Sequence, residues 1–293
     1  MIADLQPYTS PEHQPFSLGE SQSGALLIHG FPGTPAEMRP LAEILFNLGW
    51  QVRAPLLPGF GPDIANLNRR RQSDWISTTQ QEWLALHADC QNCLLVGYSM
   101  GAALALHIAS AIKPERLVLI SPFWRIAGII PHLVPVARRL APNLRLFKNA
   151  DFNDPRLRRM FATILPDADL DDPEVQNFIR TRFTLPISAM EEVLHLGRQA
   201  YRLASSIHAE GLVVQGKNDP LIRPEDTQRL IRQLGEQRTT YLEIDAGHDL
   251  LASGTLQFEQ LAKAVTGFVG PGDSLLAAPT AIHLHSPSEH HRP

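Results

Sequence analysis

A serine between two glycines, in the segment Gly97-Tyr98-Ser99-Met100-Gly101, follows an apolar run and precedes an alanine-rich stretch. When such a motif joins a strand to a helix, the serine hydroxyl is exposed on a sharp turn. The N-terminus of the helix then favours negative charge that develops next to it. Close packing of strand and helix also explains the small residues, so the motif predicts a nucleophile only if partners for Ser99 exist.

A serine becomes an effective nucleophile when a neutral imidazole accepts its proton and a carboxylate orients that imidazole. His248, in the segment LEIDAGHDLL, follows a predicted strand, and Asp219, in VVQGKNDPLI, follows another. An acid just beyond the end of a strand lies where ligands gather in open α/β sheets. Asp245 and Asp249 are nearer to His248 in sequence but are weaker candidates, because the acid should come from a neighbouring strand end.

The segment LLIHGFPGTPAEM, residues 26–38, predicts a buried strand followed by a loop and a helix. This is a suitable place for half of an oxyanion hole, whose donors we predict to be the backbone N–H groups of Phe31 and Met100. Pro32 has no N–H to donate. A plain glycine-rich turn is the alternative. We interpret His29 as a residue that holds this loop through hydrogen bonds and not as a proton carrier.

These residues need a scaffold, and the hydrophobic pattern predicts one. Strands are predicted at 25–29, 51–57, 93–98, 116–120, 211–215 and 240–244, and helices at 35–48, 74–87, 100–112, 224–234 and 254–269. Most of the strands are continuous apolar runs, which is typical of a parallel sheet buried on both faces. Thr34 and Glu37 predict a capping box for the first helix, and Ser73 a cap for the second. The alternation predicts an α/β fold with a doubly wound, mostly parallel sheet.

A long segment between the fourth and fifth predicted strands shows only helical, proline-punctuated patterns. We predict a helical cap or lid over 122–205, inserted before the last strands, on a core formed by 15–121 and 206–269. The segment 270–293 is predicted to be a disordered tail. Tyr98, Phe123, Trp124 and Ile126 are candidates for a substrate pocket. The apolar cap residues fit equally well as the core of the cap itself.

Composition limits the function classes. The chain has 293 residues, 44% hydrophobic and 19% charged, with a net charge of −4. A sizeable core is therefore expected, and general nucleic-acid binding is disfavoured because it usually requires a basic surface. The sequence has no apolar run long enough for a membrane-spanning helix and no visible secretory signal, which favours a cytoplasmic location. Cys90 and Cys93 are interpreted as reduced thiols, because a single C-x-x-C pair is poor support for zinc. No metal is expected.

Taken together, the segments LLIHGFPGTPAEMRPLAEIL, APLLPGFG, VGYSMGAALAL, VVQGKNDPLI and AGHDLL resemble the α/β-hydrolase superfamily, and most of all bacterial carboxylesterases of the monoacylglycerol-lipase-like type. The resemblance covers about residues 16–269 apart from the cap. It implies that Ser99 is the nucleophile, His248 the base and Asp219 the acid, with Phe31 and Met100 as oxyanion donors. The insertion looks long for the small esterases of that type. The region before residue 25 is short, with one strand expected around 15–18.

The resemblance implies cleavage of a small apolar carboxylic ester through an acyl-enzyme on Ser99, without a cofactor. The same fold serves thioesterases, lipases, peptidases and C–C bond hydrolases, so the bond type stays open. A haloalkane dehalogenase or epoxide hydrolase would need Asp in place of Ser99. Two readings without catalysis remain, a small-ligand sensor and a protein that touches lipid surfaces transiently through its cap. Neither stable membrane insertion nor a nucleic-acid partner is expected, and the oligomeric state is left open.

Overall fold

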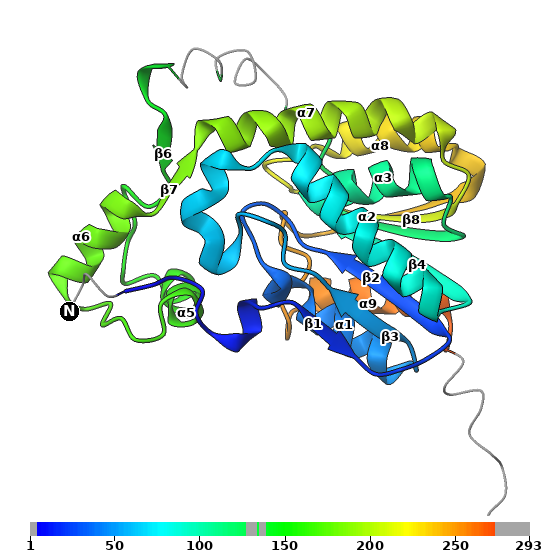
Figure 1. Cartoon of the computed structure of the whole chain (residues 1–293), viewed down its shortest axis with the longest axis horizontal. Coiled ribbons are helices and arrows are strands. Elements are labelled where there is room, and N and C mark those ends of the chain that lie inside the picture. Colours follow the sequence, from blue (N-terminus) through cyan, green and yellow to red (C-terminus); the bar gives the residue numbers. More distant parts are fainter. Residues whose placement is uncertain (1–4, 127–133, 135–138, 273–293) are drawn as a thin grey trace, which may run out of the picture.

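The computed structural model describes residues 5–126, 134 and 139–272. A seven-stranded sheet runs through the molecule in the order β1-β3-β2-β4-β5-β8-β9 (Figure 1). Only β1 is antiparallel to its neighbour, and the other pairs are parallel. The strands are β1 (Phe16–Leu18), β2 (Ser23–Ile28), β3 (Gln51–Ala54), β4 (Asn92–Tyr98), β5 (Arg116–Ile120), β8 (Glu210–Gly216) and β9 (Thr239–Ile244). The predicted α/β class and mostly parallel sheet are confirmed, and so is a strand near 15–18.

Strand order changes direction between β2 and β4. From β2 the chain moves outward to β3, whereas from β4 it moves the other way through β5, β8 and β9. In open parallel sheets the strand ends at such a switch point leave a crevice in which ligands bind. The loop after β2 and the turn after β4 both lie at this point. The topology therefore brings together the loop that was predicted to carry an oxyanion donor and the turn that was predicted to carry the nucleophile.

Helices cover both faces of the sheet, and alternate strand residues pack against each layer (Figure 1). Leu26 and Leu95 face one layer, whereas Leu27 and Leu94 face the other, and all four are fully buried. The first layer contains α2 (Gln72–Asp89), α3 (Met100–Ile112), α7 (Ile187–Leu203) and α8 (Pro224–Leu234); the second contains α1 (Arg39–Asn47) and α9 (Leu256–Val269). Such two-sided burial explains why the strands are continuous apolar runs.

The N-terminal capping box that was predicted for the first helix is wrong. Residues Pro35–Met38 form a short 3-10 helix, η3, before α1 begins, and Thr34 makes no side-chain cap. Instead, Thr34 Oγ1 lies 2.8 Å from His13 Nδ1, and Glu37 Oε2 accepts the Gly30 N–H at 3.1 Å. Both side chains therefore form hydrogen bonds with residues outside the helix. Local capping patterns are overridden when tertiary contacts offer the same groups other hydrogen bonds.

The second predicted cap is also wrong, by two residues. Helix α2 begins at Gln72 and its N-cap is Arg71, so Ser73 lies inside the first turn. Asp74 accepts the backbone N–H of Arg71 at 2.9 Å, which satisfies one of the free donors at this end of the helix. Helix ends are the least certain part of a prediction from pattern, because several polar residues in one turn can cap.

The segment predicted as a cap divides into two parts. Helices α5 (Pro155–Ile164) and α6 (Pro173–Arg182) enclose a small apolar core around Phe161 and Ile179. Two short strands that were not predicted, β6 (Asn143–Arg145) and β7 (Thr184–Pro186), pair antiparallel beside them. Helix α7, in contrast, packs along α3 and belongs to the layer over the sheet. The apolar face of α7 continues the main core, which the helical pattern alone did not reveal.

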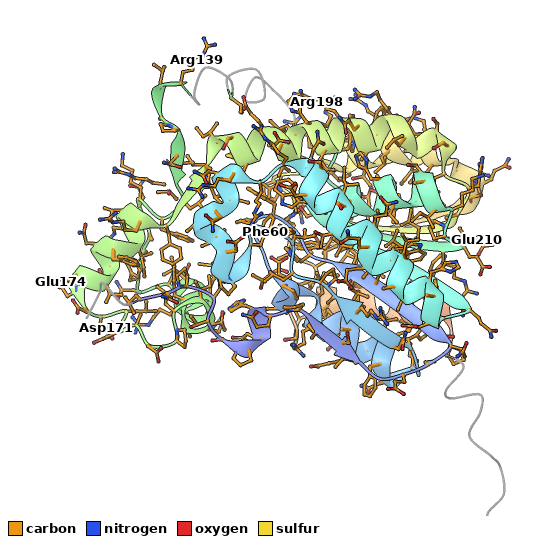
Figure 2. All side chains as sticks on the ribbon, viewed as in Figure 1. Phe60, Arg139, Asp171, Glu174, Arg198 and Glu210 are labelled. Atoms are coloured by element: carbon orange, nitrogen blue, oxygen red, sulfur yellow. The ribbon has the colours of Figure 1, made fainter. Side chains whose placement is uncertain are left out.

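Several remaining features complete the fold. Short 3-10 helices occur at η2 (Pro11–His13), η4 (Gly61–Arg69), η5 (Ala204–Ser206) and η6 (Glu236–Arg238). Figure 2 shows Phe60 inside the molecule and charged side chains such as Arg198 and Glu210 at its periphery. Among the described helices, none combines the length and apolar character needed to cross a bilayer. The tail predicted at 270–293 lies, from residue 273 onward, outside the described residues.

Candidate active site

Ser99 occupies a sharp turn between β4 and α3. Its backbone angles are φ 53° and ψ −115°, a region that side chains other than glycine rarely adopt. The Ser99 N–H donates to the Ile120 carbonyl at 2.9 Å, which ties the turn to β5. The residue is the N-cap of α3, so the helix N-terminus points toward its side chain. The strained turn thus presents the hydroxyl at the ends of the central strands.

Two glycines allow this turn to form. A Cβ atom on Gly97 would overlap the Gly101 carbonyl oxygen and lie 2.5 Å from Ala102 Cα. A Cβ atom on Gly101 would overlap the Ile28 carbonyl and lie 2.6 Å from that of His29. The obstructing atoms belong to the backbone and have no freedom to move aside. Small residues are therefore required because β2, β4 and α3 approach each other closely.

The structure brings Ser99, His248 and Asp219 into one hydrogen-bonded chain. His248 Nε2 lies 3.0 Å from Ser99 Oγ, and His248 Nδ1 lies 2.7 Å from Asp219 Oδ2. A neutral imidazole with its proton on Nδ1 satisfies both contacts, since it donates to the carboxylate and accepts from the hydroxyl. This is the arrangement in which a histidine can remove the serine proton. Asp245 and Asp249 make no such contact: Asp245 accepts from Asn218 Nδ2 and Asp249 from the Leu251 N–H.

Asp219 is held as a carboxylate although it is buried. Its Oδ1 accepts the backbone N–H groups of Leu221 and Ile222 at 2.8 and 2.9 Å, and its Oδ2 also accepts from Gln215 Nε2 at 3.1 Å. Burial raises the pKa of the carboxyl, but the hydrogen bond and charge of His248 and the two backbone donors outweigh it, so the pKa lies below its usual value. The acid is therefore ionised at neutral pH.

Two hydroxyl groups hold the backbone of His248, one from Tyr98, which was predicted as a pocket residue, and one from Ser121, which was not predicted at the site. The hydroxyls of Tyr98 and Ser121 donate to the His248 carbonyl oxygen at 3.4 and 3.2 Å. The Tyr98 ring also lies 5.4 Å from the imidazole ring. Ser121 follows β5 directly and is fully buried, so its position at a strand end beside the switch point was the one available signal.

The loop after β2 lies against the serine. A Cβ atom on Gly30 would approach Ser99 Cβ to 3.3 Å, which places the next peptide, that of Phe31, beside the site. His29 fastens the loop: Nδ1 lies 2.9 Å from the Gly30 carbonyl, and Nε2 accepts the Leu57 N–H at 3.2 Å. Burial lowers the pKa of His29 to about 4, so it is neutral, as both bonds require. In the part of the chain that the structure describes, the N–H groups of Phe31 and Met100 have no hydrogen-bond partner.

The predicted pocket residues are placed differently from one another. Trp124 is committed to packing, because its ring stacks on Tyr201 with centroids 4.1 Å apart and its Nε1 donates to the Asp226 carbonyl at 2.9 Å. Tyr98 supports His248, as described above. Phe123 donates its N–H to the Ser99 carbonyl at 3.2 Å and is buried in the core over the sheet, against which Ile126 also packs. Both contacts place Trp124 in the core, and its role in a substrate pocket stays a prediction.

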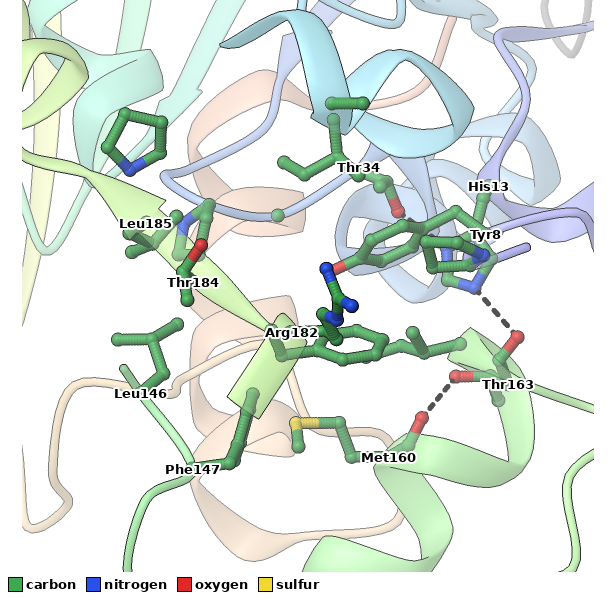
Figure 3. A pocket seen from close by; sticks show the side chains of 18 of the residues that line it. Tyr8, His13, Thr34, Leu146, Phe147, Met160, Thr163, Arg182, Thr184 and Leu185 are labelled. Carbon is green, nitrogen blue, oxygen red and sulfur yellow. Dashed lines mark hydrogen bonds between the residues drawn. The ribbon is translucent and has the colours of Figure 1, made fainter. Parts of the chain in front are cut away.

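A cavity of about 680 Å³ lies between the loop after β2 and the inserted helices (Figure 3). Pro32 and Gly33 of that loop line it, together with residues of η4, the N-terminal segment and the insertion. None of Tyr98, Phe123, Trp124 and Ile126 is among its lining residues. The sequence offered no signal for this position, because four segments that are distant along the chain form the walls.

The described residues include no group of three His, Cys, Asp or Glu side chains arranged to hold a metal ion. Cys90 and Cys93 are free thiols; burial raises the pKa of each, so they stay protonated at neutral pH. His107 joins two helices, since its Nε2 lies 3.3 Å from the Leu196 carbonyl of α7. These groups therefore take part in packing and lie outside the hydrogen-bonded chain of Ser99, His248 and Asp219.

Comparison with known proteins adds the family. The sequence matches the alpha/beta hydrolase family over residues 25–263. A thermostable monoacylglycerol lipase of Bacillus sp. (strain H-257) is 38% identical over 96 residues, which are 33% of this chain and 38% of that lipase. The match therefore spans much less than two thirds of the relative.

Solved structures share the fold over nearly their whole length. A structure reported for LipS and LipT, two metagenome-derived lipolytic enzymes, has a TM-score of 0.71 at 21% identity and covers 88% of this chain and 98% of its own. The monoacylglycerol lipase of Paleococcus ferrophilus has a TM-score of 0.65 at 19% identity, with 87% and 97% covered. At these identities the likeness establishes a common architecture. With the match over residues 25–263, it follows that this chain belongs to the alpha/beta hydrolase family, within which it is similar to lipases and esterases.

Proposed function

We propose that this protein is a serine hydrolase that cleaves carboxylic esters through an acyl-enzyme on Ser99, as a carboxylesterase or monoacylglycerol-lipase-like enzyme. The observation that carries the proposal is the continuous hydrogen-bonded chain from Asp219 through His248 to Ser99. Similarity to a monoacylglycerol lipase and to lipolytic enzymes supports an ester as the substrate. The cavity that Pro32 and Gly33 help to line has several apolar side chains in its wall, which supports an apolar acyl group.

In the first half of the reaction, Ser99 Oγ attacks the ester carbonyl carbon while His248 Nε2 takes the hydroxyl proton. A bond forms between Oγ and carbon, and the carbonyl electron pair moves onto oxygen. The N–H groups of Phe31 and Met100 stabilise that oxyanion, supported by the N-terminus of α3. When the intermediate collapses, the bond to the alcohol oxygen breaks and His248 returns the proton to the leaving alcohol. An acyl-enzyme and a free alcohol result.

In the second half, water replaces the alcohol. His248 removes a proton from water as the water oxygen attacks the acyl carbon, and the same donors hold the second oxyanion. The bond to Ser99 Oγ then breaks, the serine regains its proton from His248 and the carboxylic acid leaves. Asp219 stays ionised throughout and stabilises the imidazolium that forms in each half. The cycle needs no group beyond this chain, substrate and water.

The 680 Å³ cavity is the proposed site for the acyl chain. Its volume lies within the range of ordinary small-molecule pockets, about 300–1,000 Å³. Figure 3 shows apolar side chains of the insertion such as Phe147 and Met160 around the cavity, together with polar ones such as Arg182. Pro32 of the loop after β2 forms part of its wall. The lining includes Ile64, Leu146, Phe147, Met160, Phe178 and Leu185. A chain lying there would bring its carbonyl group near the loop that carries Phe31.

The test is hydrolysis of p-nitrophenyl esters from acetate to palmitate by the wild type and by Ser99→Ala. The variant removes one oxygen from a residue that is 8% exposed, so we expect an unchanged circular dichroism spectrum and a loss of turnover of at least about 10³-fold. Within the wild type, we expect chains long enough to fill the cavity to react with a higher kcat/KM than acetate. The Ser99→Ala preparation also serves as the control for contaminating esterases.

Ester hydrolysis that persists undiminished in a clean Ser99→Ala preparation would contradict the nucleophile and the proposed function. A wild type that is folded but inactive on every ester would contradict ester specificity. Thioesters of the same chain lengths would then be assayed, because the same acyl-enzyme chemistry applies to them. A chain-length profile without preference beyond acetate would contradict the cavity as the acyl site.

A further inference from the structure

Glu37 places its carboxyl group inside the loop that follows β2. Glu37 belongs to η3, and its Oε2 accepts the Gly30 N–H at 3.1 Å, across seven residues of chain. On the other side, a Cβ atom on Gly33 would overlap the carboxyl carbon and both of its oxygens. The turn itself closes through the Gly33 N–H, which donates to the Gly30 carbonyl at 3.2 Å. The segment from Gly30 to Gly33 therefore wraps around this one carboxyl group.

Gly30 of the same segment also lies against Ser99. A Cβ atom on Gly30 would lie 3.3 Å from Ser99 Cβ and 3.2 Å from the Tyr98 ring. Gly30 is thus confined between the Glu37 carboxyl group, which holds its N–H, and the serine turn. The Phe31 N–H belongs to the next peptide, so its direction depends on how Gly30 is held. A donor that is displaced by about 1 Å stabilises the oxyanion much less.

We propose that Glu37 is a positioning residue for catalysis, which through its hydrogen bond to Gly30 N–H keeps the Phe31 N–H aimed at the oxyanion. This inference rests on the proposed function, because it needs an oxyanion at Ser99. Glu37 does not touch the reacting atoms. It acts through Gly30, and its effect should therefore appear in the transition state and not in substrate binding.

The surroundings of Glu37 determine which substitution preserves its action. Desolvation raises the pKa of this carboxyl group to about 7; the Gly30 N–H lowers the pKa, nearby Asp249 raises it, and His248 lowers it. Both the neutral acid and the carboxylate have an oxygen that accepts from Gly30, and glutamine keeps such an oxygen at the same distance. Glu37 itself lines the cavity. The other titratable or charged groups that face it or line the cavity are Tyr8, His13, Tyr98, Arg182, His248 and Asp249.

The experiment compares kcat and KM of four proteins on the best p-nitrophenyl ester. Glu37→Ala removes the acceptor, and we expect kcat to fall by about 10- to 100-fold while KM changes less than about threefold. Glu37→Gln keeps the acceptor and should stay within about threefold of the wild type. Glu43→Ala, an exposed position on α1, is the matched control and should match the wild type. A trifluoromethyl ketone with the same acyl chain, which binds as an oxyanion adduct, should lose affinity for Glu37→Ala in proportion to kcat.

Three results would overturn the inference: an unchanged kcat in Glu37→Ala, a loss confined to KM, or an equal loss in Glu37→Gln. If Glu37→Ala does not fold, Glu37→Met replaces it, since methionine fills the space without accepting the hydrogen bond, and the same fall in kcat is expected. Ser99-dependent hydrolysis that is insensitive to all Glu37 variants overturns this inference alone. Absence of hydrolysis by the wild type overturns the proposed function, and this inference with it.

Discussion

The carboxylate of Asp219 has more hydrogen-bond donors than the other acids near His248. His248, Gln215 and two backbone N–H groups share its two oxygens, and Gln215 is itself held by the Thr227 hydroxyl at 2.7 Å. Each donor stabilises the charged form and fixes the direction of the oxygen that meets His248. The surrounding network therefore determines both the charge and the orientation of the acid.

Replacement of Asp219 by Asn should disable the site without unfolding it. The amide is nearly isosteric, but its NH₂ group would donate to His248 Nδ1 and move the imidazole proton to Nε2, which then could not accept from Ser99. We expect kcat to fall by about 10³- to 10⁴-fold at pH 7. The exposed Asp245, which accepts a hydrogen bond from Asn218 Nδ2 at 2.7 Å, supplies the control Asp245→Asn.

Steady-state kinetics on one ester, with thermal melts of all three proteins, make the comparison. Comparable losses in Asp219→Asn and Asp245→Asn would contradict the assignment of the acid. A fall in kcat of less than about tenfold for Asp219→Asn would do the same, because the wrong tautomer should nearly abolish base catalysis.

At the scale of elements, the turn at Ser99 depends on how closely α3 approaches β2. The Ile28 and His29 carbonyls lie where a Cβ atom on Gly101 would be, whereas the space around Gly267 on α9 is open within 4 Å. Both glycines lie in helices, but only one lies at the contact between helix and sheet. Alanine substitutions at the two positions therefore distinguish the effect of helix propensity from the effect of the packing that forms the turn.

Gly101→Ala should destabilise the fold by more than about 3 kcal/mol, because a methyl group meets rigid backbone in a packed core. Gly267→Ala should instead stabilise it by about 0.5–1 kcal/mol, as alanine does in a helix interior. Urea denaturation of both variants measures the difference. Equal stabilities would show that α3 can move away from β2, and would contradict the close approach as the reason for the glycine.

At the scale of the whole molecule, the buried His13 and His29 and the half-buried His107 make contacts that suit the neutral ring. Burial lowers the pKa of His29 to about 4, and it also lowers the pKa values of His13 and His107. In the unfolded chain these rings have an ordinary pKa near 6.5. As pH falls below 6.5, the unfolded state binds protons that the folded state does not. The contribution of these three histidines to the free energy of unfolding must therefore decrease toward acid pH.

His29→Gln should reduce that acid sensitivity. Removing a group with a pKa of about 4 in the folded state and 6.5 in the unfolded state should lessen the loss of stability between pH 7 and pH 5 by about 2 kcal/mol. The comparison uses the change in the free energy of unfolding with pH and not its absolute value, because the variant also loses the hydrogen bonds to Gly30 and Leu57. The exposed His208 supplies the control His208→Gln, for which the slope of the wild type is expected. Parallel slopes for all three proteins would contradict a neutral buried His29.

Much of the fold could be predicted from the sequence. Continuous apolar runs identify parallel strands buried on both faces, and strand–helix alternation then leaves few topologies. The candidate residues Ser99, Asp219 and His248 were predicted because each follows a strand, and parallel strands end at one edge of the sheet. Both rules act over a few neighbouring residues, so a single sequence is sufficient to apply them.

Other features were decided only by the tertiary structure. Thr34 and Glu37 match a capping pattern, but His13 and Gly30 bind their side chains instead. The N-terminal segment is fastened to α5, since Tyr8 N–H donates to the Ile164 carbonyl at 2.7 Å and His13 Nε2 lies 3.2 Å from the Thr163 carbonyl (Figure 3).

The cavity shows the same limit of sequence reasoning. Pro7, Ile64, Phe147 and Leu185 lie on separate segments, yet all of them line it. The sequence by itself determined the sheet and the residues at its strand ends, because those follow from local periodicity. The tertiary structure decided which polar groups pair and where the cavity lies, because both depend on which distant segments pack together.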